Sequence, residues 1–73
     1  MKLLAYVKKE ARRENVSIVT YIGKIAYKAN MPIASFKSYM YEDRRPGAVA
    51  AVKIYKATGK QVRLEDLLLE DGE

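Results

Sequence analysis

Hydrophobic residues recur along most of this chain at intervals of three or four positions, which is the spacing of one face of an α-helix. Leu3, Val7 and Ala11 predict a first helix over residues 2–14, and Asn15 is expected to end it. The opposite side of this helix carries four cations, Lys8, Lys9, Arg12 and Arg13. We interpret that side as a solvated outer face.

The second hydrophobic stripe passes through a segment that local preference alone assigns to a strand. Residues 18–22, IVTYI, are rich in β-branched side chains. The helical spacing nevertheless continues to Ala29, and a stripe of that length outweighs five residues of local preference, so we predict a helix. Ser17 is its expected N-cap, because the hydroxyl can accept a hydrogen bond from a free backbone N–H. Gly23 indicates tight packing, or the close approach of a partner helix or a phosphate.

Residues 22–41, IGKIAYKANMPIASFKSYMY, predict two short helices joined by a tight turn. Ala26 is small enough for the two helices to cross at close range. Asn30 is expected to leave the first helix in the left-handed conformation, which Asn tolerates well. Pro32 fits the first turn of the second helix, where its missing N–H costs nothing. The rest of the chain is expected to support this pair.

The second helix of the pair, predicted over residues 32–42, has two different faces. Met31, Phe36 and Tyr39 are expected to point back toward the first helix. The other face is left exposed and carries five residues, Ile33, Ala34, Lys37, Ser38 and Tyr41. A helix held on one side and offered on the other is what a helix-turn-helix motif presents to the DNA major groove.

Five positions of this stretch resemble the helix-turn-helix of phage Cro-type regulators: Ala26, Asn30, Met31, Phe36 and Tyr39. That family usually has Gly where this chain has Asn30. The later segment RRPGAVAAVKIYKATGKQVRLEDLL is similar to the tail of antitoxin-associated prophage Cro homologues, so the resemblance covers about residues 17–69. Those relatives commonly carry Thr where this chain has Arg63.

The resemblance implies a compact all-α bundle of about five short helices, with a lambda-repressor-like fold, forming a single domain over residues 1–73. It also implies a sequence-specific transcriptional regulator, a Cro-like repressor that occupies an operator in double-stranded DNA. Because a protein of this size offers few base contacts, we expect a homodimer, at least on DNA, with half-sites about 34 Å apart. The expected location is the cytoplasm, at the bacterial nucleoid or in a phage-infected host.

Two more helices are predicted after the motif. Pro46 is expected in the first turn of one, and Gly59 ends it in a left-handed cap. One side of this helix is predicted to face the core, formed by Ala48, Val52 and Tyr55 and widened by Ala51 and Ile54. Residues 64–69 predict a short last helix that turns Leu64, Leu67 and Leu68 inward. Leu69 is left outside beside the acidic tail 70–73, as a candidate self-association edge.

Composition removes several classes of chemistry. The chain has no Cys and no His, which excludes a disulfide framework, a thiolate zinc site and a His-assisted Ser or Cys nucleophile. Metal binding through carboxylates alone stays open by composition, but nothing in the sequence resembles a calcium loop. We expect neither an enzyme nor a cofactor, a metal or a small-molecule substrate. No apolar run approaches the roughly 18 residues of a membrane span, so no membrane partner is expected.

The distribution of charge adds a reason to consider DNA. The net charge is +5, but residues 1–60 hold thirteen Lys and Arg against four acids, a balance of +9. Residues 61–73 hold one Arg against five acids, a balance of −4. A basic body favours a polyanion through phosphate neutralisation and counterion release. By charge alone, a solvated lysine-rich surface is an equally good interpretation.

The side chains suggest a division of labour on DNA. Lys37 and Ser38 are candidates for hydrogen bonds to base edges, Ile33 and Ala34 for thymine methyl groups, and Tyr41 for a base or phosphate. Five flanking residues are candidate phosphate contacts: Thr20, Tyr21, Lys24, Arg44 and Arg45. The alternative for these five is ordinary surface cover. The alternative function is an antitoxin-like or other protein-interaction module with secondary DNA binding.

Overall fold

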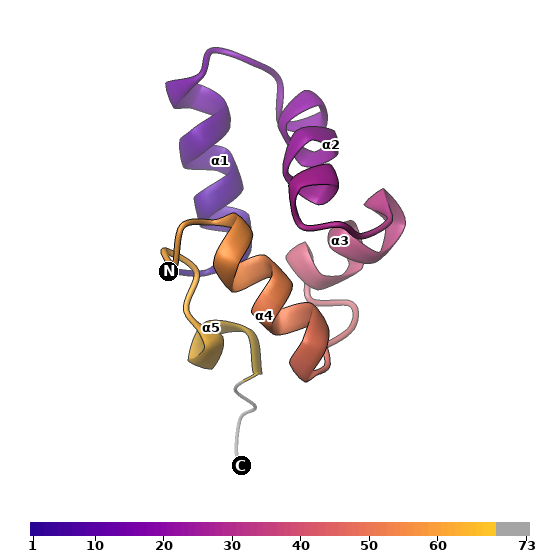
Figure 1. The fold of residues 1–73 in the computed structure, drawn as a ribbon. Helices are drawn as coiled ribbons and strands as arrows, with labels where there is room; N and C mark the ends of the chain where they lie inside the picture. Colours follow the sequence, from indigo (N-terminus) through magenta and orange to yellow (C-terminus); the bar gives the residue numbers. More distant parts are fainter. Residues whose placement is uncertain (69–73) are drawn as a thin grey trace.

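The hydrophobic spacing predicted the helices correctly in number and order. The structure is a computed structural model that describes residues 1–68, and this part of the chain contains five helices, arranged as in Figure 1. They are α1 Leu3–Arg13, α2 Ile18–Lys28, α3 Ile33–Met40, α4 Ala48–Ala57 and α5 Leu64–Leu68. The described residues contain no strand, so the all-α prediction is confirmed, including a helix through the β-branched residues 18–22.

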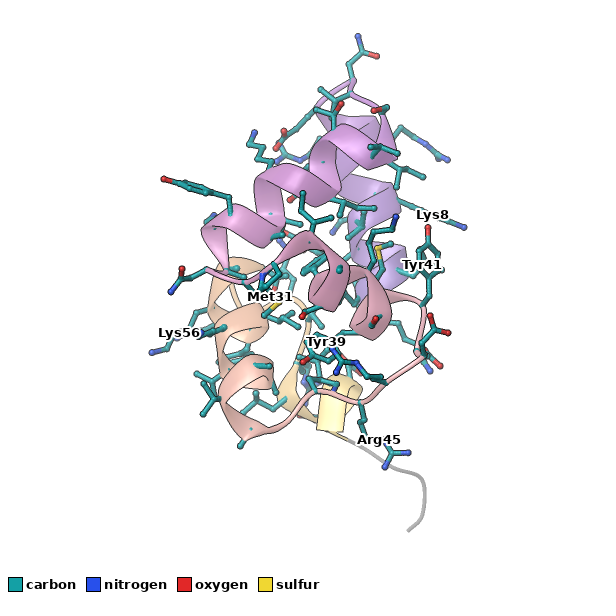
Figure 2. The ribbon with its side chains drawn as sticks, turned by 90° about the vertical axis from the view of Figure 1, so that its right-hand side faces the viewer. Lys8, Met31, Tyr39, Tyr41, Arg45 and Lys56 are labelled. Atoms are coloured by element: carbon teal, nitrogen blue, oxygen red, sulfur yellow. The ribbon has the colours of Figure 1, made fainter. Side chains whose placement is uncertain are left out.

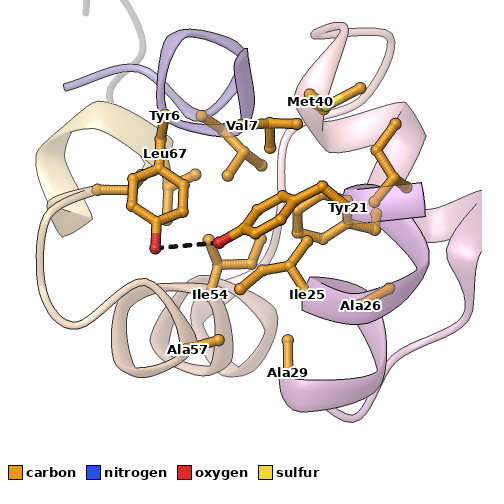
Figure 3. Close-up of a cluster of buried hydrophobic side chains, with 14 of the residues drawn as sticks. Tyr6, Val7, Tyr21, Ile25, Ala26, Ala29, Met40, Ile54, Ala57 and Leu67 are labelled. Atoms are coloured by element: carbon orange, nitrogen blue, oxygen red, sulfur yellow. Dashed lines mark hydrogen bonds between the residues drawn. The ribbon is translucent and has the colours of Figure 1, made fainter. Parts of the chain in front are cut away.

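All five helices contribute to one hydrophobic core. In Figure 1, α1 and α2 lie side by side, α3 follows below α2, and α4 and α5 close the lower part of the bundle. Figure 3 shows the core between them, with Tyr6 and Val7 from α1 facing side chains of the other helices. The side chains of Phe36 and Ile54 are fully buried. Because Phe36 is buried in this core, the core fixes the position of α3 through the inner face of the helix.

The helix ends follow the predicted cap chemistry. The Ser17 hydroxyl accepts a hydrogen bond from the Thr20 N–H at 3.1 Å, which confirms Ser17 as the N-cap of α2. Asn15, Asn30 and Gly59 have φ of 57°, 58° and 63°, as expected for left-handed helix ends. At Asn30 the next N–H, of Met31, donates to the Ala26 carbonyl at 3.0 Å, which completes a Schellman motif.

Both proline positions differ by a small shift from the prediction. Pro32 is the N-cap of α3, with an extended ψ of 147°, so it precedes the first turn. Pro46 precedes Gly47, which is the N-cap of α4. The predicted span 32–42 of the motif's second helix is also too long, since α3 ends at Met40 and Glu42 takes a left-handed φ of 64°.

The predicted inner face of α4 is only partly correct, because the structure confirms Ala51 and Ile54 but not the other three residues. Ala48 and Val52 are exposed and Tyr55 is half-buried, whereas the buried residues of the helix are Ala51, Ile54 and Ala57. The sequence AVAAV is apolar around the whole helix, so its spacing cannot define one face.

In α5, Leu67 is buried as predicted and Leu64 is half-buried. The Leu68 side chain, Leu69 and the acidic tail 70–73, on which further predictions fall, lie outside the described residues. The longest helices in the described part have 11 residues, and none is long and apolar enough to cross a bilayer.

Candidate nucleic-acid interface

Helix α3 is divided into a buried side and an exposed side. Phe36 and Met40 are fully buried on the core side. Four of the five residues predicted on the outer face are exposed, namely Ile33 at 52%, Ala34, Lys37 and Tyr41 at 51%, and Ser38 is half-buried. Figure 2 looks onto the side of the molecule where α3 lies in front. The helix thus offers one continuous strip of small, apolar and polar side chains.

The two polar groups in the middle of this strip have no partner in the described part of the protein. The Lys37 ammonium forms no ion pair with residues 1–67, and the Ser38 hydroxyl forms no hydrogen bond with them. An ammonium has three donors and a hydroxyl can both donate and accept. Both groups can therefore bind an external acceptor without breaking an internal contact.

The junction between α2 and α3 is less crowded than Gly23 suggested. A Cβ atom built on Gly23 meets Ile33 Cδ1 at 3.8 Å, which is ordinary van der Waals contact. Tight packing is therefore not the reason for glycine at this position, which corrects that interpretation. The Ile33 side chain therefore lies beside the middle of α2.

Tyr21 belongs to the core and does not face solvent. Its side chain is 4% exposed, and its hydroxyl donates a hydrogen bond to the Tyr6 hydroxyl at 3.4 Å (Figure 3). Burial, followed by this hydrogen bond, raises the pKa of Tyr21 above its usual value. The expectation that Tyr21 contacts a phosphate is therefore wrong. The sequence held the signal, because Tyr21 lies four residues before Ile25 on the buried stripe.

The other two candidates at the start of α2 are on the surface but already have partners. The Thr20 hydroxyl accepts a hydrogen bond from the Ser17 hydroxyl at 2.9 Å. The Lys24 ammonium forms an ion pair with Glu14 at 2.7 Å, and its hydrogen bond lowers the pKa of Glu14. A phosphate at this end of the interface must compete with the Glu14 carboxylate for Lys24.

Arg44 and Arg45 lie beyond the C-terminal end of α3, as the sequence predicted. Both are exposed, and they line a groove of about 590 Å³ between the start of α1, the segment joining α3 to α4, and α5. The groove also contains carboxylates of Glu42, Asp43 and Asp66, so its charge is mixed. The Arg44 guanidinium lies 5.3 Å from the centre of the Tyr39 ring. The sequence does not reveal this contact, because the helical spacing places Tyr39 only on the core side of α3.

No group of three or more carboxylates within the described residues is placed to hold a metal ion. The arrangement instead combines a presented helix with cations at both of its flanks. Comparisons with protein-family models, curated proteins and solved structures find no match to this chain.

Proposed function

We propose that this protein binds double-stranded DNA with α3 in the major groove and acts as a sequence-specific transcriptional regulator, a Cro-like repressor. One observation carries the proposal: α3 is anchored by Phe36 and Met40, while its opposite side exposes Lys37 without a partner among the described residues. A major groove about 12 Å wide admits one helix presented in this way.

The base contacts come from the exposed strip of α3. Lys37 donates to the acceptors of guanine, and Ser38 donates or accepts with little selectivity. Ile33 and Ala34 contact thymine methyl groups, and Tyr41 reaches a base or a phosphate at the far end. With few bidentate readers on this face, the shape of the DNA also contributes to specificity.

The phosphate contacts come from the flanks of α3. Thr20 and Lys24 contact phosphates on one flank of the helix, and Arg44 and Arg45 contact phosphates on the other. Each neutralised phosphate releases condensed counterions, which favours binding and makes affinity fall with salt. So small a protein offers few base contacts, and half-sites about 34 Å apart would let two copies bind the same face of B-DNA. We therefore propose that two copies bind a palindromic site, at least when DNA is present.

A second candidate function is an antitoxin-like protein-interaction module in which DNA binding is secondary. Large apolar side chains outside the α3 strip favour it: Tyr27 is 89% exposed and Val49 is 72% exposed. Surface aromatics and aliphatics of this kind are common at protein–protein contacts. Here the expected ligand is another protein.

Selection of bound sequences from random duplex DNA tests the proposal directly. We expect enrichment of one motif with two-fold symmetry. The double variant Lys37→Ala, Ser38→Ala should bind that motif about 10- to 100-fold more weakly, while its thermal unfolding stays nearly unchanged. Lys56→Ala is the matched control, because Lys56 is exposed on α4, away from Arg45 in Figure 2.

Three results would contradict the proposal. Absence of any enriched motif would exclude sequence-specific binding. Unchanged affinity in the double variant would exclude the α3 strip as the reading surface. A DNA affinity that does not change with salt would exclude phosphates as the main ligand.

A further inference from the structure

Tyr39 lies between the core and the candidate phosphate contacts. It is half-buried and packs against the hydrophobic core, and Figure 2 shows it beneath α3, on the side where the chain continues toward Arg45. The Arg44 guanidinium lies over this ring, with its carbon atom 5.3 Å from the ring centre. A cation at this distance is attracted to the electron-rich face of the ring.

The backbone independently fixes Arg44 relative to α3. Glu42 adopts a left-handed φ of 64°, which turns the chain back at the end of the helix. The N–H groups of Asp43 and Arg44 then both donate to the Ser38 carbonyl, at 2.9 and 3.3 Å. Arg44 is thus tied to the residue that sits in the middle of the proposed reading strip.

The edge of the Arg44 guanidinium is open. Arg44 forms no ion pair with the described residues, and the nearby Glu42 carboxylate is paired with the Lys2 ammonium at 3.3 Å. The guanidinium lies over the Tyr39 ring, and its N–H donors form no hydrogen bond with the described residues. Those donors match the geometry of two phosphate oxygens.

We propose that Tyr39 is a positioning residue for DNA binding. Its ring holds the Arg44 guanidinium so that the guanidinium N–H groups donate to a backbone phosphate beside the C-terminal end of α3. This inference rests on the proposed DNA-binding function. A free Arg side chain loses much rotamer freedom when it binds, and a side chain already held on a ring loses less. Tyr39 therefore acts on affinity through Arg44 and not through a contact of its own.

A double-mutant cycle measured by fluorescence anisotropy on the selected duplex tests the proposal, using the full chain with Arg44→Gln, Tyr39→Leu and both changes together. Arg44→Gln should weaken binding and reduce the slope of log K against log salt by about 0.9, the value for one phosphate contact. Tyr39→Leu should weaken binding about two- to fivefold when Arg44 is present. It should cause no further loss when Gln occupies position 44. Tyr39→Phe, which keeps the ring, should restore most of the affinity lost in Tyr39→Leu.

The controls separate this role from a structural one. Thermal unfolding of each variant sets a temperature at which all are folded, and Lys56→Gln shows the effect of losing an unrelated surface cation. An equal effect of Tyr39→Leu with and without Arg44 would mean that the ring acts only in packing, and would overturn the inference. An unchanged salt slope in Arg44→Gln would also overturn it. If the Lys37→Ala, Ser38→Ala variant still loses affinity in that case, DNA binding by α3 stands and only the role of Tyr39 fails.

Discussion

Replacing Gly23 with Ala is expected to stabilise the protein, although a glycine in the middle of a helix at a helix crossing usually indicates that nothing larger fits. Gly23 has ordinary helical geometry within α2, and it is absent from the positions with positive φ. Glycine at an interior helical position is less favourable than Ala because its backbone loses more freedom on folding. The added methyl group should remove that disadvantage.

The magnitude follows from two contributions. Helix propensity favours Ala over Gly by about 0.8–1 kcal/mol. The new Cβ lies 3.8 Å from Ile33 Cδ1, a favourable carbon–carbon distance that contributes about 0.1–0.2 kcal/mol. The expected gain of about 1 kcal/mol corresponds to a rise in Tm of about 4–8 °C for a domain of this size. Thermal unfolding followed by circular dichroism measures it.

Gly59→Ala is the matched control, because it makes the same chemical change with the opposite expected sign. No atom lies within 4 Å of a Cβ on Gly59, but its φ of 63° is left-handed. A side chain there costs about 1–2 kcal/mol. Lower stability of the Gly23→Ala protein would refute the reasoning and restore tight packing as the role of Gly23. Higher stability with clearly weaker DNA binding would mean instead that a phosphate approaches the Gly23 backbone.

Three other predictions follow from the core, the ion pairs and the reading strip. Tyr21→Phe leaves the buried Tyr6 hydroxyl without its partner, so it should lower the free energy of unfolding by about 1 kcal/mol in urea titrations. The same variant should leave DNA affinity unchanged, and a loss of affinity would return Tyr21 to the interface. The lowered pKa of Glu14 means that its ion pair stabilises the fold above the usual carboxyl pKa. This contribution should disappear as the pH falls through the folded-state pKa, so Glu14→Gln should flatten that part of the stability profile. Replacing thymines of the selected site with deoxyuridine removes only methyl groups and should weaken binding if Ile33 and Ala34 contact them; equal affinity would exclude these contacts.

The elements of this fold could be predicted from sequence because their signals are local. Helix spacing and the left-handed ends at Asn15, Asn30 and Gly59 depend on a few neighbouring residues. The inner face of α4 could be predicted only in part, since its apolar residues surround the helix and do not separate Ala51 and Ile54 from Ala48 and Val52. Glu42 was also missed as a left-handed residue, because Glu has no intrinsic preference for that conformation and the end of α3 imposes it.

The candidate interface also has a part that local sequence signals predict and a part that they do not. The outward strip of α3 could be predicted, because Phe36 fixes which side is buried and the remaining positions follow from helical geometry. The chemistry of the cations that flank α3 could not be predicted, because it depends on contacts between distant parts of the chain. Tyr39 holds Arg44 across the turn after α3, and Glu14 of the α1 end pairs with Lys24 of α2. Counting cations in the sequence treats Lys24 and Arg44 as equivalent, although within residues 1–67 only Lys24 is paired with an acid.

That difference leads to a prediction about the paired cation. Lys24 must leave Glu14, at 2.7 Å, before it can bind a phosphate, so the carboxylate competes with DNA. Glu14→Gln should therefore strengthen binding to the selected duplex by more than removal of one negative charge elsewhere does. Glu65→Gln is the matched control, because Glu65 is also on the surface and pairs with one cation, Arg63, at 2.7 Å. Both changes raise the net charge by one unit, so equal gains in affinity would mean that only the overall charge matters. A larger gain for Glu14→Gln that disappears when Lys24 is replaced with Ala would place Lys24 at the DNA backbone.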